Sequence, residues 1–224
     1  MKKLPEVDLT CEPLTRMLFG AIPGRLLLTA IELKVFSCLS QPMSADALAA
    51  NLGTHPLNTS FLLDALAAND LLAKRGGQYV NTPLAGTFLV EGEPTYVGDV
   101  LLADAEWMRP ALEDMPALVR HGPSASTRPR PSIPPAKEAE IYANEQRAGI
   151  AQRAAAMVSR LPEFGRMQKM LDLGCGAGLI GLAIVAAHPT MTGVLFDRPA
   201  IVQVAQTFID EYELQDRITT IGGD

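Results

Sequence analysis

Three alternating glycines, Gly174, Gly176 and Gly178, follow a short apolar run that carries a single acid, Asp172. An apolar, helix-like stretch over residues 179–187 comes directly after them. A strand that opens into glycines before a helix brings backbone close to a ligand in α/β proteins, because a Cβ would block the approach. These residue types and their spacing therefore predict a ligand-binding strand–turn–helix unit.

A second acid, Asp197, ends the apolar run over residues 192–196, 25 positions after Asp172. This spacing fits one strand–helix–strand crossover, which places two strand ends side by side in a parallel sheet. A carboxylate at such an end can accept hydrogen bonds from both hydroxyls of a ribose. Residues 199–224 read as a third unit of helix, strand, two glycines and Asp224. We expect the three strand ends to form a crevice the size of a nucleoside.

Two nucleoside cofactors compete for this crevice. Residues 176–181 match the G-x-G-x-x-G spacing of dinucleotide sites, with an acid about 20 residues later. Asp172 argues against a nicotinamide cofactor, because it would face a pyrophosphate unfavourably yet could hold the ammonium group of a methionine moiety. We favour S-adenosylmethionine over NAD(P), and a tight turn without a ligand is the third interpretation.

The ordered segments DLGCGAG, GVLFDRP and DRITTIGGD resemble the motif series of class I S-adenosylmethionine-dependent methyltransferases. More narrowly, the chain resembles bacterial members of the plant-type, acetylserotonin O-methyltransferase-like family. The segments TAIELKVFSCLSQPMSADALAANLG and LLAKRGGQYVNTPLA are similar to that family's opening helices and winged-helix hairpin. The resemblance covers roughly residues 10–224 and is weakest between 121 and 140.

The resemblance implies an α/β Rossmann-like methyltransferase domain after an all-α, winged-helix dimerisation domain. It implies methyl transfer to a hydroxyl of a small aromatic or polyketide-like metabolite. Only the first three strands of the sheet lie in the chain, so we expect a member truncated at its C-terminus. The general-base histidine of the family would then lie beyond residue 224, and we expect no catalytic residue in this chain.

The resemblance also suggests a role for each residue of the crevice. The backbone at the three glycines would pass under the methionine part, and Asp172 would orient its amino end. Asp197 would bind the ribose hydroxyls, and Asp224 would lie near the adenine. Two apolar residues would pack beside the cofactor, Leu179 and Pro199.

We expect three segments: a winged-helix-like dimerisation domain over residues 1–95, a helical linker and substrate-pocket region over 96–165, and the cofactor domain over 166–224. A proline-rich loop over 121–135 interrupts the middle segment. The helices expected beside this loop, over 95–120 and 136–160, carry four candidates for the substrate pocket: Trp107, Met108, Tyr142 and Met157. Ordinary core packing is the competing interpretation for each of them.

The N-terminal segment predicts helices over residues 12–20 and 23–39, and the second is apolar around much of its circumference. A homodimer through these helices is the expected use of that surface. Helix, turn, helix and hairpin also describe a DNA-binding winged helix. Lys74 and Arg75 are the only basic residues over 41–90, however, and a recognition helix needs cations for phosphates. A non-catalytic winged-helix regulator stays open as an alternative, as does an NAD(P)-dependent oxidoreductase.

Composition favours a cytoplasmic globular protein. The chain has 224 residues, 48% apolar and 20% charged, with a net charge of −6, which disfavours nucleic acid and anionic membranes as partners. Three cysteines show neither metal-ligand spacing nor a disulfide pattern, and Cys175 in the glycine turn reads as a small filler residue. None of the three histidines, His55, His121 and His188, has an acidic partner nearby in sequence, so we expect none to act as a base.

Overall fold

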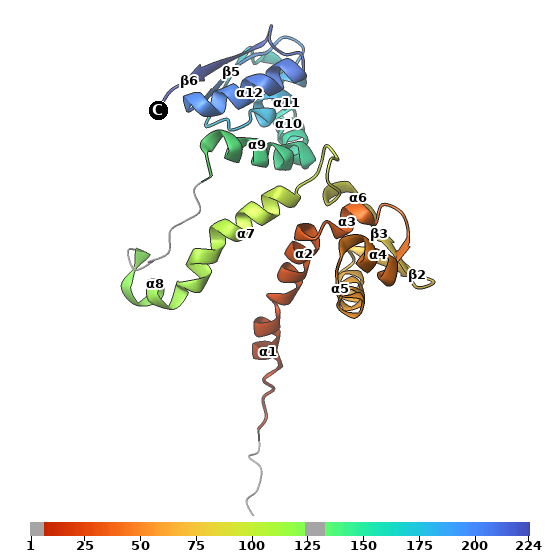
Figure 1. The fold of residues 1–224 in the computed structure, drawn as a ribbon. Helices are drawn as coiled ribbons and strands as arrows, with labels where there is room; N and C mark the ends of the chain where they lie inside the picture. Colours follow the sequence, from red (N-terminus) through yellow and green to blue (C-terminus); the bar gives the residue numbers. More distant parts are fainter. Residues whose placement is uncertain (1–6, 124–132) are drawn as a thin grey trace, which may run out of the picture. The chain divides into compact units, whose positions relative to one another are not determined.

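The structure, a computed structural model, describes residues 7–123 and 133–224 and divides into two compact units, Met1–Glu91 and Gly92–Asp224 (Figure 1). The helical region expected over residues 96–165 belongs to the same unit as the sheet. Most of the proline-rich loop expected over 121–135 lies outside the described residues.

The first unit is mainly helical with a small antiparallel sheet. Its helices are α1 (Glu12–Phe19), α2 (Ile22–Glu32), α3 (Val35–Cys38), α4 (Ala45–Leu52), α5 (Pro56–Ala68) and α6 (Pro83–Phe88), and its strands are β1 (Met43–Ser44), β2 (Leu72–Arg75) and β3 (Gln78–Asn81). The prediction of one helix over residues 23–39 is wrong. Lys34 adopts the left-handed conformation with φ 58°, which ends α2 and redirects the chain so that α3 buries Val35 and Phe36.

Local signals set the other boundaries of this unit. Ser44 caps α4 by accepting the backbone N–H of Ala47, and Gly53 ends that helix in the left-handed conformation with φ 66°. The hairpin between β2 and β3 turns on Gly76 and Gly77, which both have positive φ, as a two-residue hairpin loop requires. The strand order β1-β3-β2 beside α4 and α5 has the predicted winged-helix plan.

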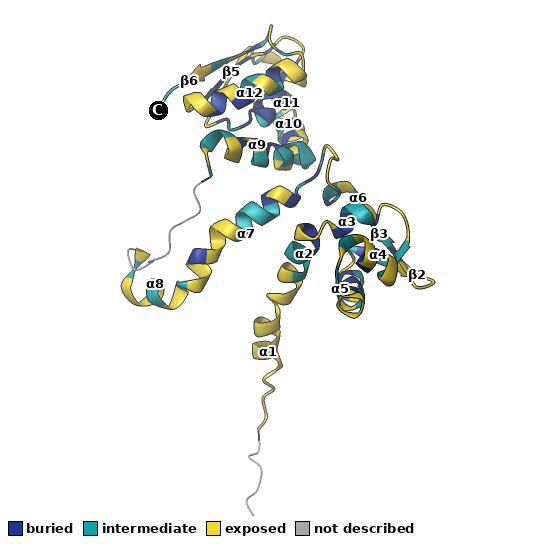
Figure 2. Cartoon of the chain, in the orientation of Figure 1, coloured by how far each residue is buried: buried dark blue, intermediate teal, exposed yellow. Residues whose placement is uncertain are grey.

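Helices α1 and α2 expose apolar side chains. Every residue of α1 is exposed (Figure 2), among them Met17 at 80% and Leu18 at 73%. The stretch Glu12–Glu32 is long and apolar enough to cross a membrane by length and composition alone. Only 11% of its most apolar 18 residues are buried. Exposed apolar area of this kind indicates a surface that binds a protein chain or a membrane.

The second unit begins with helices and ends with a parallel sheet. Its helical elements are α7 (Gly98–Glu113), α8 (Met115–His121), α9 (Pro135–Glu145), the π-helical turn η2 (Gln146–Ile150), α10 (Ala151–Val158) and the 3-10 turn η3 (Phe164–Arg166). They are followed by β4 (Lys169–Leu173), α11 (Leu179–Ala186), β5 (Thr192–Asp197), α12 (Pro199–Glu211) and β6 (Ile218–Gly222).

Three of the predicted helices in this unit are shorter or interrupted. The helix expected over 95–120 divides at Asp114 into α7 and α8. The helix expected over 136–160 is interrupted by η2, where Gly149 takes φ 122°. The amphipathic stretch 199–215 predicts the helix of the third unit, but this helix ends at Glu211, and Glu213 beyond it has φ 56°. In the last two cases a residue with positive φ breaks the helical backbone.

The sheet has the predicted parallel order β4-β5-β6, so its three carboxyl ends lie along one edge. Helices α11 and α12 both pack on the face that carries Leu195 and Ile218, where one apolar core forms. Side chains of the opposite face are open, with Leu171 at 59%, Leu173 at 69% and Ile221 at 53% exposure. The core of the unit therefore sits between the sheet and the two crossover helices.

Candidate functional site

The glycine turn between β4 and α11 adopts backbone angles that favour glycine at each of its three positions. Gly174, Gly176 and Gly178 have φ values of 74°, 55° and 80°. At Gly178 a Cβ would lie 2.6 Å from Cδ1 of Leu195, so the sheet also leaves no room for a side chain. The positive φ values and the lack of space for a Cβ at Gly178 both accompany the close passage of the turn over the end of β5.

Asp197, at the carboxyl end of β5, is hydrogen-bonded to this turn. Its Oδ2 accepts the backbone N–H of Gly176 at 2.8 Å, and its Oδ1 accepts the backbone N–H of Arg198 at 2.7 Å. An ionised carboxylate has about four acceptor positions, so two remain for a ligand. The turn therefore holds a half-buried carboxylate in one orientation with acceptor capacity to spare.

A cavity of about 270 Å³ opens beside Asp197 and the glycine turn. We call it the Asp197 cavity, and its lining residues are Pro135, Glu138, Ala139, Tyr142, Gln146, Gly176, Ala177, Asp197, Arg198 and Ile201. Helix α9 and turn η2 supply one wall, and the glycine turn, the end of β5 and the start of α12 supply the other. This cavity is small for a whole ligand pocket, which is typically about 300–1,000 Å³.

Gln146 is a residue of this cavity that the sequence analysis missed. Its Oε1 accepts the backbone N–H of Leu179, the first residue of α11, at 3.2 Å. The N–H groups at the start of a helix have no intrahelical partner, so Gln146 satisfies one of them. No local motif marks Gln146, because η2 lies 33 positions before Leu179 in the chain.

Tyr142 is the substrate-pocket candidate that the structure places in the Asp197 cavity. Its hydroxyl donates to Oδ1 of Asp104 in α7 at 2.5 Å. That hydrogen bond, and then burial, raise the pKa of Tyr142 to about 12. The other three candidates are exposed and do not line this cavity, with Trp107 at 57%, Met108 at 46% and Met157 at 68% exposure.

Asp172 lies apart from the Asp197 cavity. Its Oδ2 is 3.0 Å from the position that a Cβ on Gly181 would take, so the carboxylate lies under α11. It lines a separate groove along β4 of about 290 Å³, together with Ile180 and Ile184. Burial, and then the charge of Asp197, raise the pKa of Asp172. The two carboxylates are thus close enough to interact, although different openings expose them.

The remaining predicted cofactor residues surround the same sheet edge. The Leu179 side chain lines a different cavity, on the other side of α11. Pro199 packs against Gly222, whose hypothetical Cβ would lie 3.1 Å from Cα of Pro199. The backbone N–H of Gly223 donates to the Asp197 carbonyl at 3.0 Å, which brings the exposed Asp224 to the end of β5.

The cysteine and histidine near the turn have structural surroundings. Cys175 is buried, and burial, then Asp172 and Asp197, raise the pKa of its thiol to about 12, so it is a poor nucleophile. His188 is buried at the end of α11, and its Nδ1 accepts the backbone N–H groups of Thr190 and Met191. Among the described residues, no group of three His, Cys, Asp or Glu side chains could hold a metal ion.

Two family models match the chain on these elements. The O-methyltransferase dimerisation domain matches residues 15–91, and the O-methyltransferase domain matches residues 138–224. The chain belongs to this O-methyltransferase family. The predicted resemblance is therefore confirmed, and the second match includes both the glycine turn and Asp197.

Curated relatives extend over most of the chain. The N,N-dimethyltransferase OxyT of Streptomyces rimosus is 31% identical over 208 residues, 88% of this chain and 59% of that protein. Acetylserotonin O-methyltransferase of Bos taurus is 28% identical, covering 92% of this chain and 64% of that protein. The 3-hydroxy-5-methyl-1-naphthoate 3-O-methyltransferase of Streptomyces sahachiroi is 27% identical, covering 94% of this chain and 62% of that protein. The chain thus spans about three fifths of the length of these relatives.

Solved structures share the fold. The structure of PigF with SAH matches with a TM-score of 0.78 at 24% identity, over 96% of this chain and 67% of that one. Human N-acetylserotonin methyltransferase in complex with SAM matches with a TM-score of 0.75 at 22% identity, over 99% of this chain and 68% of that one. The predicted Rossmann-like domain after a winged-helix dimerisation domain is confirmed by these matches.

Proposed function

We propose that the protein binds S-adenosylmethionine and serves methyl transfer to a hydroxyl of a small aromatic or polyketide-like metabolite. One observation carries the proposal: the carboxylate of Asp197 is held beside the glycine turn by the N–H of Gly176, at the carboxyl end of β5. A parallel sheet binds nucleosides at that edge. Two similar structures, PigF with SAH and human N-acetylserotonin methyltransferase in complex with SAM, contain ligands that such a site would take.

The charge of the Asp197 cavity favours this cofactor over a dinucleotide. Glu138 and Asp197 both line the cavity, and Arg198 is the one cation among its lining residues. An acidic surface suits a ligand with a sulfonium and an ammonium group, but it repels a pyrophosphate. A pyrophosphate would also need the free N–H groups at the start of α11, where Gln146 already accepts the N–H of Leu179.

We propose the following roles for the predicted residues around the ligand. The backbone of the glycine turn would pass under the methionine part, and Asp172 would orient the amino group from below α11. The two unused acceptor positions of Asp197 would take the ribose hydroxyls. Asp224 would lie near the adenine, and Pro199 would pack beside the cofactor. Leu179 would meet the cofactor only through its backbone, because its side chain lines a different cavity.

Bound S-adenosylmethionine would supply an electrophilic methyl group, and this chain's residues would position it. We propose that Tyr142 borders the methyl end, because its ring lines the Asp197 cavity. Its hydrogen bond to Asp104 fixes the ring, and its hydroxyl, the donor in that bond, is protonated at neutral pH. Trp107, Met108 and Met157 are proposed for the acceptor side, where their exposed side chains are accessible.

The acceptor atom has a second candidate. The family is named for transfer to oxygen, and the naphthoate relative carries that name as well. OxyT, at 31% identity, is named as an N,N-dimethyltransferase, which favours testing amines beside phenols. We propose the hydroxyl as the primary acceptor, because it agrees with the family description.

We also propose that the protein is a cytoplasmic homodimer. The dimerisation-domain match over residues 15–91 includes the exposed apolar surface of α1 and α2. A protein interface would cover the side chains that water otherwise meets there. The net charge of −6 opposes binding to anionic membranes or nucleic acid.

Calorimetric titration with S-adenosylmethionine, S-adenosylhomocysteine, NADH and NADPH tests the proposal. We expect saturable binding of the first two and no heat of binding from the nicotinamide cofactors. Binding of NADH without a response to S-adenosylmethionine would overturn the cofactor assignment. Binding of none of the four would favour the non-catalytic winged-helix regulator. Incubation with methyl-labelled cofactor and phenol or amine acceptors then tests for transfer.

A further inference from the structure

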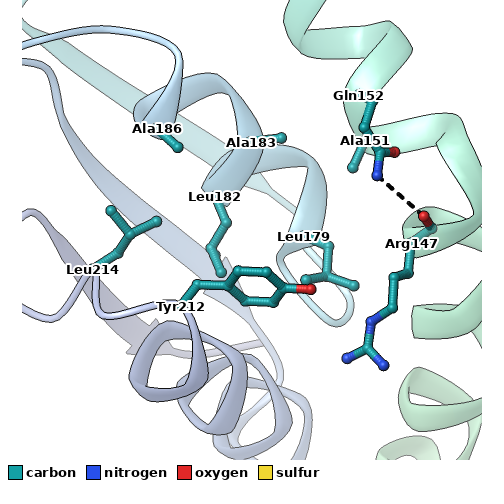
Figure 3. Close-up of a pocket in the computed structure, with 9 residues that line it drawn as sticks. All are labelled: Arg147, Ala151, Gln152, Leu179, Leu182, Ala183, Ala186, Tyr212 and Leu214. Carbon is teal, nitrogen blue, oxygen red and sulfur yellow. Dashed lines mark hydrogen bonds between the residues drawn. The ribbon is translucent and has the colours of Figure 1, made fainter. Parts of the chain in front are cut away.

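A second cavity, of about 240 Å³, lies between α10, α11 and the segment after α12 (Figure 3). We call it the Arg147 cavity. Its walls are mainly apolar, formed by Ala151, Leu179, Leu182, Ala183, Ala186 and Leu214. Three polar side chains, Arg147, Gln152 and Tyr212, complete the lining. None of these residues lines the Asp197 cavity, so the two openings are separate.

Alanines create the space. Ala183 of α11 points toward Ala151 of α10, and Ala186 lies one turn further along α11, in a region where larger side chains would fill the cavity. Figure 3 shows the Tyr212 ring lying beneath Leu182 and extending toward Leu179 and Arg147. The cavity is therefore an apolar slot that ends at a guanidinium.

Arg147 carries a hydrogen-bond donor that the protein leaves unused. One Nη is 3.5 Å from Oε1 of Glu211, and the guanidinium carbon is 5.2 Å from the centroid of the Phe208 ring. The Nε is buried and has no hydrogen-bond partner among the described residues. An unsatisfied buried donor costs free energy, more so when it is charged, and an added acceptor would recover it.

We propose that the Arg147 cavity binds a small amphipathic carboxylate, with its apolar body between α10 and α11 and its carboxylate on Arg147. A carboxylate matches the planar fork of a guanidinium, and a small turn of the Arg147 side chain would bring its Nε and one Nη to the two oxygens together. At about 30 Å³ for each water-sized group, the volume of about 240 Å³ holds roughly eight such groups. Octanoate is therefore a suitable probe.

Among the ion pairs of the described residues, Glu211 is the acid that contacts Arg147. Its negative charge would repel a bound carboxylate, which provides a second test of the proposal. Its side chain is 54% exposed, so solvent weakens its attraction for the guanidinium and its repulsion of a bound anion. Removing its charge would still favour an added carboxylate. The proposal therefore expects opposite effects from neutralising Arg147 and neutralising Glu211.

The experiment is a calorimetric titration of the 224-residue protein with octanoate, with octylamine and octanol as probes of charge. We expect saturable octanoate binding and at least tenfold weaker binding of the other two. Arg147→Gln should weaken octanoate binding at least tenfold, Ala183→Phe should abolish it by filling the slot, and Glu211→Gln should strengthen it about two- to fivefold.

Arg153→Gln is the matched control, because Arg153 is exposed and lines none of the cavities described above. It should leave octanoate binding unchanged. Thermal unfolding of each variant shows whether it folds. If Arg147→Gln does not fold, the effect of Glu211→Gln on octanoate binding still tests the proposal. Failure of octanoate to saturate the protein, equal binding of octanol, or weaker binding to Glu211→Gln would each overturn the proposal. Binding of S-adenosylmethionine is a separate measurement, so either proposal can fail alone.

Discussion

The two cavities beside the π-helical turn η2 differ in the charge that lines them. The Asp197 cavity presents the carboxylates of Asp197 and Glu138, whereas the Arg147 cavity presents one guanidinium among alanines and leucines. Gln146 and Arg147 are adjacent in sequence, yet each lines a different cavity. One backbone turn thus separates a site suited to a cation from a site suited to an anion, because neighbouring helical residues point in different directions.

The largest expected effect concerns the backbone under the Asp197 cavity. Gly178→Ala should destabilise the protein by about 2–4 kcal/mol, because the new Cβ would meet Leu195 at 2.6 Å and φ is 80°. Denaturant unfolding measures the change. Gly165→Ala is the control, since Gly165 has open space around it, and it should change stability by about 0.5 kcal/mol or less. Equal effects of the two substitutions would contradict the close packing of the turn.

The second prediction separates the cavities functionally. Asp197→Ala should weaken S-adenosylmethionine binding about 10- to 100-fold, because the ribose would lose its acceptors and Gly176 would lose its partner. Octanoate binding at Arg147 should not change. Asp216→Ala, at an exposed aspartate before β6, should alter neither affinity in calorimetry. Unchanged cofactor affinity in Asp197→Ala would remove the role assigned to that carboxylate.

The third prediction uses the interaction between Asp172 and Asp197. Burial and the charge of Asp197 raise the pKa of Asp172 in the folded state, so its ionisation opposes folding. The penalty is absent below the unfolded pKa of about 3.9 and grows as pH rises through the folded pKa. Asp172→Asn should therefore raise the midpoint of thermal unfolding at pH 7, by about 2–4 °C for each kcal/mol recovered.

The same substitution should weaken cofactor binding if Asp172 holds the ammonium group. At pH 3.5 the thermal unfolding midpoints of Asp172→Asn and the unaltered protein should nearly coincide, because the aspartate is then largely protonated. If Asp172→Asn instead lowers the thermal unfolding midpoint at pH 7, the carboxylate stabilises the protein without a ligand. That result would contradict the expectation that burial makes its ionised form unfavourable.

The smallest expected effect concerns the wall of the Asp197 cavity. Asp104→Asn should lower the pKa of Tyr142 from about 12 toward 10, since the hydrogen bond to Asp104 is the largest cause of its shift. Ultraviolet absorbance during a pH titration measures tyrosine ionisation. Glu138→Gln removes a weaker charge effect and should move the same pKa less. An equal shift in both variants would contradict the assigned hydrogen bond.

Local backbone requirements made several features predictable. Gly174, Gly176 and Gly178 mark positive φ values that other residues rarely adopt, so their spacing predicted the turn. Ser44 and Gly53 bound α4 as residues of their types commonly do, because caps act within a few residues of the helix end. In each case the residue type that indicates the turn or the helix end is also the residue that forms it.

Other features depended on contacts between distant segments. The left-handed conformation of Lys34 is uncommon for its residue type, and burial of Phe36 in α3 offsets that cost. The meeting of Gln146 with Leu179 joins positions 33 apart, and no local pattern predicts such a pair. The exposure of Trp107 and Met108 likewise depends on the packing of α7, which their residue types do not reveal.

The sequence by itself determined the order of strands, the glycine turn and the acid at the end of β5, because chain direction and backbone angles are local properties. Tertiary structure decided which side chains share an opening. It placed Asp172 under α11, Asp197 on the N–H of Gly176, and Arg147 at the end of an apolar slot. These outcomes depend on how helices pack against a sheet, since packing alone sets which surface each carboxylate or guanidinium faces.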